Sequence, residues 1–145
     1  MGLGEDSEHI HRSSPSSPRI GLVTEPRDAV DLSARPLSAQ SGDLSARIIS
    51  MGNTHRALPL TGALCLAAAA RIRGTVVHRH TRVEREDPAT LRILQPSGVS
   101  VVGAEVEERA GGDWHVRLAT VYRTQRRLFE GSVLIPASRL PQTAP

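Results

Sequence analysis

The hydrophobic residues of this chain are most concentrated near its middle, where residues 62–70 are all small or apolar. A helix on a protein surface has polar residues along one side, so an apolar circumference indicates a helix enclosed by other elements. At about 1.5 Å per residue, a helix over residues 61–73 would be roughly 20 Å long, too short to cross a bilayer. The pattern therefore predicts one short central helix.

Residues at both ends of this stretch are typical of helix boundaries. Thr61 can cap the amino end with its hydroxyl, and Pro59 prevents the helix from extending backwards. Two arginines lie in the last turn, and Gly74 can adopt the left-handed conformation that closes a helix. Because Gly62 has no side chain, an anion could reach the free backbone N–H groups beside it. The amino end is therefore a candidate carboxylate or phosphate site, although Thr61 and Gly62 could serve only as the cap.

Beyond Gly74 the pattern changes to one typical of strands. We predict strands over residues 75–83, 90–94, 99–106, 114–122 and 132–135. Upstream, residues 19–24 form a run of β type, and residues 43–50 fit either a short helix or a strand, of which we favour the strand. Short strands around one apolar helix predict an α+β fold, with a curled, mostly antiparallel sheet wrapped around the central helix.

The chain is expected to hold one folded domain, over residues 19–137. Residues 1–18 are polar and rich in serine and proline, which is typical of a tail or linker, and residues 138–145 form a short tail. A chain of 145 residues can bury a core. With 39% hydrophobic but only 2% aromatic residues, that core is expected to consist of alanine, valine, leucine and isoleucine.

All 18 basic residues are arginines, and the net charge is +3. Without lysine, the chain can provide neither a lysine base nor a Schiff base. The excess of positive charge lies after residue 50, but Trp114, Tyr122 and Phe129 are too few to form a stacking platform for bases. We therefore expect no binding of nucleic acid.

Cys65 is the only cysteine, so no internal disulfide can form, and a reducing compartment is the simplest environment. Its position among alanines in the predicted helix indicates a buried thiol rather than a nucleophile. His78 and His80 have the spacing of metal ligands, but no third ligand is close, so we expect no metal site. The amino terminus has no apolar stretch resembling a signal peptide or membrane anchor, and we expect a cytoplasmic location.

Four motifs follow one another in the order seen in a known family. They are SPRIGLV from Ser17, MGNTHRALPLTGALCLAAAARIRGTVV from Met51, QPSGV from Gln95 and VYRTQRRLFEG from Val121. Together they resemble the C-terminal half of the 2-methylaconitate isomerase (PrpF-like) family, almost continuously over residues 17–136. That family shares its fold with diaminopimelate epimerase, so the resemblance implies one half of that fold.

The resemblance also implies a function. It indicates a cofactor-independent isomerase domain that acts on unsaturated tricarboxylates, by cis–trans isomerisation of 2-methylaconitate or a related tautomerisation. The implied partners are a small tricarboxylate substrate and a missing or separately encoded N-terminal half. We expect the chain alone to be poorly active, and to associate with itself through the surface that its missing partner would cover.

The candidate substrate-binding residues are implied by the resemblance and, for Thr61 and Gly62, also by their place at the amino end of the predicted helix. They are His55, Thr61, Gly62, Ser97, Gly98 and Arg123. A guanidinium can clamp a carboxylate with two hydrogen bonds, and successive N–H groups in a Pro-Ser-Gly turn can hold an anion. The structural alternatives are a solvated arginine at a rim, a plain turn, and a loop histidine that is satisfied by the backbone.

The chain departs from the families it resembles at positions that matter for the site. Leu94 and Gln95 stand where the family usually has Gly-His before the turn, a change that would alter the pocket wall. Pro59 stands where the epimerase relatives have a catalytic cysteine, so this half lacks the thiol that a two-thiol mechanism requires. The base of the family is a lysine from the other half, and we therefore name no catalytic residue in this chain.

Two functions of other classes remain open. One is a noncatalytic remnant or partner module that pairs with a separate N-terminal half. The other is a small basic domain that binds polyanions, for which a steep dependence of nucleic-acid binding on salt would be the evidence. Selective binding of a citrate-like tricarboxylate would count against the polyanion-binding domain.

Overall fold

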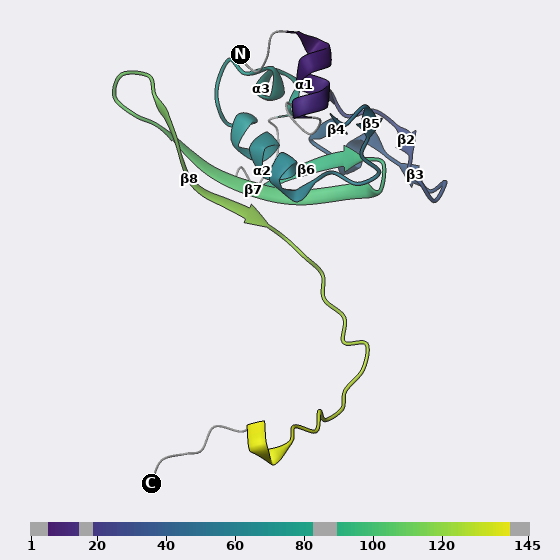
Figure 1. Ribbon diagram of the computed structural model, residues 1–145. Helices are drawn as coiled ribbons and strands as arrows, with labels where there is room; N and C mark the ends of the chain where they lie inside the picture. Colours follow the sequence, from purple (N-terminus) through teal and green to yellow (C-terminus); the bar gives the residue numbers. More distant parts are fainter. Residues whose placement is uncertain (1–5, 15–18, 83–89, 140–145) are drawn as a thin grey trace.

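A computed structural model describes residues 6–14, 19–82 and 90–139, and its main feature is a curled sheet packed against one helix (Figure 1). The main sheet is six-stranded, with the order β1-β4-β6-β7-β8, and β5 pairs with β4 outside this path. The strands are β1 (Ile20–Thr24), β4 (Leu44–Ser50), β5 (Asn53–Thr54), β6 (Thr90–Gln95), β7 (Gly98–Glu108) and β8 (Trp114–Val121). This architecture is the predicted α+β fold, with a sheet curled against a single apolar helix.

Most neighbouring strands of this sheet are antiparallel, as predicted. The exception is the pair of β4 and β6, which run parallel with Leu44 opposite Ile93. Along β4 the buried and partly buried residues alternate, since Leu44, Ala46 and Ile48 are buried. Alternation of this kind is the mark of a strand with one face toward the core, and it confirms the strand predicted over residues 43–50.

The helix α2 (Leu60–Ala69) covers one face of the sheet. Its short alanine side chains let it lie close to β7 and β8. The buried core that it shares with the strands consists of Leu44, Ala46, Ala63, Leu66, Ala67, Ala70, Leu91, Ile93, Val102 and Ala104. A core of alanine and branched aliphatic residues agrees with the composition.

The helix is not enclosed on all sides, which corrects one prediction. Cys65, which we expected to be buried, is exposed together with Leu60 and Thr61. The sheet curls around only one side of α2, so the opposite side of the apolar circumference faces outward. Small residues around the whole helix therefore indicate close packing against the sheet, and they do not indicate that other elements cover every side of the helix.

The structure shows what the residues at the two ends of α2 do. The N-cap is Pro59, which has no capping side chain, so the cap predicted at Thr61 is wrong because the helix begins one residue earlier. At the other end the prediction is wrong, because α2 ends at Ala69 and not at residue 73, so Gly74 does not close the helix although its φ is 86°. Arg71, just beyond the helix, donates a hydrogen bond of 2.8 Å to the Ala67 carbonyl. The arginine thus satisfies a free carbonyl at the negative end of the helix dipole.

The strand predicted over residues 75–83 is wrong, because residues 76–80 form the short helix α3 (Val76–His80). Thr75 caps it, with its hydroxyl accepting a hydrogen bond of 3.1 Å from the His78 amide. Residues two apart do not face the same way on a helix, so His78 and His80 lose their shared face. Position 83 lies outside the described residues.

The strand predicted over residues 132–135 is also wrong. Residues 122–136 contain no helix or strand and lead away from the sheet in an extended path (Figure 1). Phe129 is 89% exposed and Leu134 is 94% exposed. Within the described ranges no strand pairs with residues 132–135, and a strand cannot form without a neighbour with which to pair.

The remaining elements are short. They are α1 (Ser7–Ser13), the two-stranded sheet of β2 (Ala29–Val30) and β3 (Pro36–Leu37), η1 (Ala39–Ser41) and η2 (Ala137–Arg139). Asp6 caps α1 by accepting a hydrogen bond of 2.7 Å from the His9 amide, and none of the residues of α1 is buried. No helix in the described part of the chain has the length and apolar character needed to cross a membrane.

Candidate functional site

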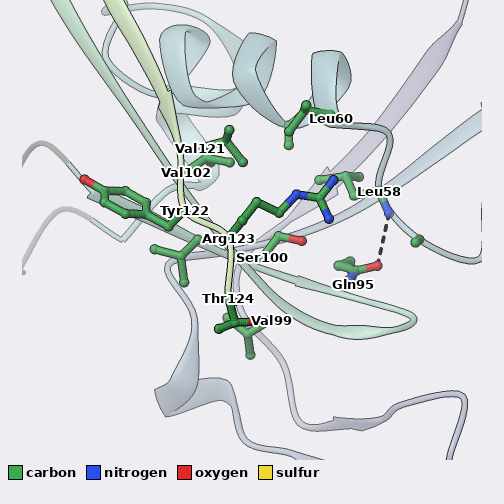
Figure 2. Close-up of a pocket in the computed structure, with 13 residues that line it drawn as sticks. Leu58, Leu60, Gln95, Val99, Ser100, Val102, Val121, Tyr122, Arg123 and Thr124 are labelled. Carbon is green, nitrogen blue, oxygen red and sulfur yellow. Dashed lines mark hydrogen bonds between the residues drawn. The ribbon is translucent and has the colours of Figure 1, made fainter. Parts of the chain in front are cut away.

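A cavity of about 510 Å³ lies between the amino end of α2 and the sheet (Figure 2). Its wall is formed by residues from the loop before α2, the first turns of α2, the end of β6, the start of β7, the end of β8 and the segment that follows β8. They are Ala57, Leu58, Leu60, Ala63, Gln95, Val99, Ser100, Val101, Val102, Val121, Tyr122, Arg123 and Thr124. Most of this wall is apolar, and none of the described residues that line it is acidic.

Arg123 lies two residues beyond the end of β8 and lines this cavity. Figure 2 shows its guanidinium reaching across the cavity toward the side on which Leu58 and Leu60 lie. The guanidinium has neither an ion pair nor a hydrogen bond with any described residue. A cation that no protein carboxylate neutralises is available to bind the carboxylate of a ligand.

Gln95 is the buried polar residue of the cavity wall, with only 5% of its surface exposed. Its side-chain oxygen accepts a hydrogen bond of 3.1 Å from the Leu58 amide and one of 3.2 Å from the Ser97 amide. Figure 2 shows the first of these hydrogen bonds as a dashed line. One side chain thereby joins the loop before α2 to the turn between β6 and β7.

The Pro-Ser-Gly turn that contains Ser97 and Gly98 lies beside the cavity but does not line it. The Ser97 hydroxyl donates a hydrogen bond of 2.6 Å to the Arg56 carbonyl, which adds a second link to the loop before α2. Gly98 has φ of 120°, a conformation that side chains rarely adopt, so glycine is needed there. In the structure these two residues shape the turn.

Thr61 and Gly62 occupy the first turn of α2, where the backbone N–H groups have no partner within the helix. The first intrahelical hydrogen bond at this end runs from the Ala63 amide to the Pro59 carbonyl, at 2.9 Å. The Thr61 side chain is exposed, and a Cβ on Gly62 would lie 3.5 Å from Ile48. That distance is an ordinary van der Waals contact, so the packing against β4 does not require glycine at position 62.

His55 connects β5 to the loop before α2. Its amide donates a hydrogen bond of 2.9 Å to the Ile48 carbonyl, and the residue is partly buried. No described residue makes a hydrogen bond with its ring. The residue does not line the cavity of Arg123.

A loop over residues 31–35 supports the turn from outside. The Leu32 amide donates a hydrogen bond of 2.8 Å to the Pro96 carbonyl, and Asp31 holds the loop in shape. The pKa of the Asp31 carboxyl lies below its ordinary value, chiefly because the Arg35 amide donates a hydrogen bond to it. The Arg35 guanidinium, 2.7 Å from Oδ2, and the Ser33 amide act in the same direction, while burial opposes them.

Of the six residues predicted to bind substrate, Arg123 is the one that lines the cavity. Thr61 and Gly62 lie at the positive end of the adjacent helix, and His55, Ser97 and Gly98 lie in neighbouring loops. The sequence identified Gln95 only as a departure from the family pattern and did not reveal its two hydrogen bonds. Within the described residues no group of histidine, cysteine, aspartate and glutamate could hold a metal ion.

Comparison with known proteins identifies the family. The family model described as PrpF protein matches residues 1–136. The chain is 34% identical over 141 residues to 3-methylitaconate isomerase of Eubacterium barkeri, a match that covers 97% of this chain and 36% of that protein. It is also 34% identical over 136 residues to 2-methyl-aconitate isomerase of Cupriavidus necator, which covers 94% of this chain and 33% of the relative.

A solved structure agrees with the sequence comparisons. The crystal structure of methylitaconate-delta-isomerase matches with a TM-score of 0.73 and 32% identity, over 97% of this chain and 37% of that one. The chain thus spans about a third of the length of the relatives it matches. Family model, relatives and structure all agree, and the chain belongs to the PrpF protein family.

Proposed function

We propose that this chain provides the carboxylate-binding part of a cofactor-independent isomerase for small unsaturated tricarboxylates. The observation that carries the proposal is the unpaired guanidinium of Arg123 in a cavity without an acidic lining residue, a statement that holds for the described residues. The name of one relative, 2-methyl-aconitate isomerase, supports an unsaturated tricarboxylate, and that of the other, 3-methylitaconate isomerase, supports a related unsaturated dicarboxylate.

The chemistry of such an isomerase explains why a guanidinium beside the substrate carboxylate would promote the reaction. A proton is removed next to a conjugated carboxylate and returned elsewhere, so the double bond shifts or rotates. Negative charge develops on that carboxylate in the transition state, and cationic or N–H donors placed beside it stabilise that charge. We assign this role to Arg123, and we retain His55, Thr61, Gly62, Ser97 and Gly98 as candidates for contacts with the remainder of the substrate.

The base is proposed to come from outside this chain. No lysine is present, and the relatives are about three times as long as this sequence. An additional N-terminal part would supply the base and close the open side of the cavity. We also propose a cytoplasmic location, which is supported by the presence of a single cysteine.

The proposal is tested by separating binding from turnover. Isothermal titration calorimetry with tricarballylate measures binding, and proton NMR follows the isomerisation of 2-methylaconitate. We expect the chain alone to bind tricarballylate but to isomerise 2-methylaconitate slowly, and to become faster when the N-terminal part of the Cupriavidus necator relative is added. Rapid turnover by the chain alone would contradict the division of roles, and a failure to bind would refute the proposed cavity.

A noncatalytic partner module is the second candidate, and the exposed apolar residues of the segment 122–136 favour it. Such a module would bind the N-terminal part of a relative without binding tricarboxylates. A polyanion-binding domain would behave differently again, since its affinity would fall steeply with salt concentration. The same calorimetric experiment, repeated in high salt, distinguishes these alternatives.

A further inference from the structure

The orientation of the Gln95 amide is determined by its partners. Both groups that contact its side-chain oxygen, the Leu58 and Ser97 amides, are N–H donors. An N–H donor requires an acceptor, so the atom between them is the oxygen and not the nitrogen of the amide. The nitrogen Nε2 must therefore lie at the other corner of the planar group.

This nitrogen has two N–H bonds to donate and no partner among the described residues. Gln95 is nevertheless 95% buried by its surroundings, since only 5% of its surface is exposed, and it lines the cavity. Among the described side chains, Nε2 is not one of the unpartnered polar atoms that are completely shielded from solvent, so it retains some access to solvent. A buried donor without a protein partner is costly unless something else accepts its hydrogen bonds.

Arg123 and Gln95 border the same cavity. Figure 2 shows the guanidinium of Arg123 extending toward the side on which Leu58 and Gln95 lie. One group is a charged donor, and the other is a neutral donor held in place by two backbone hydrogen bonds. A carboxylate has two oxygen atoms and about four sites that accept hydrogen bonds, so it can satisfy both donors together.

We propose that Nε2 of Gln95 and the guanidinium of Arg123 together bind one carboxylate of the ligand. This inference rests on the proposed function and adds a specific contact to it. The neutral amide would donate a directed hydrogen bond to the carboxylate without adding charge. Its oxygen already accepts hydrogen bonds from the two backbone amides, which hold the side chain in place. Because an amide does not titrate near neutral pH, the contribution of Gln95 to affinity is the same on both sides of pH 7.

The Gln95→Glu substitution separates the two functions of this side chain. One carboxylate oxygen can still accept from the Leu58 and Ser97 amides, so the link between the loops is kept. The second oxygen replaces Nε2, which removes a donor and places negative charge toward the ligand. Gln40→Glu is the matched control, since Gln40 lies in η1, outside the cavity, and the change in charge is identical.

Binding of tricarballylate to the 145-residue chain is measured by calorimetry for the original sequence and both variants. We expect Gln95→Glu to weaken binding by about tenfold to a hundredfold, which is typical for loss of a hydrogen bond to a charged group. Gln40→Glu should leave the affinity within about twofold. In NMR spectra of the unsubstituted chain, the side-chain amide signal of Gln95, assigned from its contacts with the Leu58 and Ser97 amides, should shift on addition of tricarballylate.

The outcomes distinguish this inference from the proposed function. Binding that is unaffected by Gln95→Glu, together with an unshifted Gln95 amide signal, overturns the role of Gln95 and leaves the proposed function standing. Absence of binding by the unsubstituted chain overturns both. If Gln95→Glu fails to fold, the NMR titration of the unsubstituted chain decides alone, because it requires no substitution.

Discussion

At the scale of single residues, binding depends most directly on the guanidinium of Arg123. Replacing it with methionine keeps most of the length of the side chain but removes the charge and all donors. We expect Arg123→Met to weaken the binding of tricarballylate by about tenfold to a hundredfold, because a hydrogen bond between ionised groups is lost. Calorimetry measures this effect, and Arg117→Met in β8 is the control, since Arg117 does not line the cavity.

Two results would speak against this role. Equal losses in Arg123→Met and Arg117→Met would indicate a general effect of positive charge, as expected for a polyanion-binding surface. An unchanged affinity in Arg123→Met would place the carboxylate elsewhere, for example at the first turn of α2 beside Thr61 and Gly62.

Asp31 makes stability depend on pH through the loop that supports the turn. Because its pKa is lowered in the folded state, the ionised carboxylate stabilises the fold above its ordinary pKa, and this stabilisation is lost as pH falls through the folded value. We expect Asp31→Asn to be less stable than the original chain at neutral pH, and the difference to disappear in acid. Urea unfolding at a series of pH values measures it, with Asp113→Asn in the exposed β7–β8 turn as the control.

A difference between Asp31→Asn and the original chain that stays constant down to strongly acidic pH would contradict this account. In that case the loop would depend on both side-chain oxygens as hydrogen-bond acceptors and not on their charge. The hydrogen bond from Leu32 to Pro96 would then link the loop to the turn without electrostatic help.

At the scale of elements, α2 has two sides that should respond differently to substitution. Ala67 is fully buried against the sheet, whereas Cys65 is exposed. Enlarging the buried residue by Ala67→Leu should reduce the free energy of unfolding by about 1–3 kcal/mol, because the helix cannot move away from β7 without losing other contacts. Cys65→Ala should change it by less than about 0.5 kcal/mol.

Reaction with a thiol reagent tests whether one side of α2 is exposed, and it requires no substitution in the core. In the folded chain Cys65 should react with a reagent such as dithionitrobenzoate as fast as an exposed thiol does. Protection of Cys65 until the chain unfolds would mean that α2 is covered on both sides, as the apolar sequence first indicated.

Elements whose signals are local and periodic could be predicted from the sequence. The alternation in β4 and the apolar runs of β6, β7 and β8 predicted strands that the structure confirms. The helix α3 was missed because β-branched residues indicated a strand, while the cap at Thr75 favours a helix locally. The strand predicted over residues 132–135 failed because a strand depends on a neighbour that sequence pattern does not specify.

The cavity could be predicted only in part, for a related reason. Arg123 was identified because it belongs to a motif of the family. The role of Gln95 depends on a hydrogen bond to Leu58, 37 residues away, and such a contact is not encoded in any local pattern.

At the scale of the whole molecule, the segment 122–136 should cause the chain to associate. Its apolar residues are exposed, and Phe129 and Leu134 are the most exposed of them, at 89% and 94%. Exposed apolar surface of this kind favours contact with another chain. We expect the full chain to form oligomers whose proportion rises with concentration, and the double variant Phe129→Ser/Leu134→Ser to shift the equilibrium toward monomer.

Sedimentation velocity measures both species over a range of concentrations. The double variant keeps every residue that lines the cavity, so its binding of tricarballylate should match that of the full chain. A full chain that stays monomeric at high concentration would contradict the prediction, as would association that the double variant does not reduce.

The central claim, that the cavity beside α2 binds carboxylates, is tested most directly by an NMR titration of the isotopically labelled chain with tricarballylate. The account predicts saturable shifts concentrated at residues that line the cavity, including Leu58, Gln95 and Arg123, and persisting in moderate salt. Absence of saturable shifts would contradict it, and so would shifts that are scattered over surface arginines and disappear when salt is added.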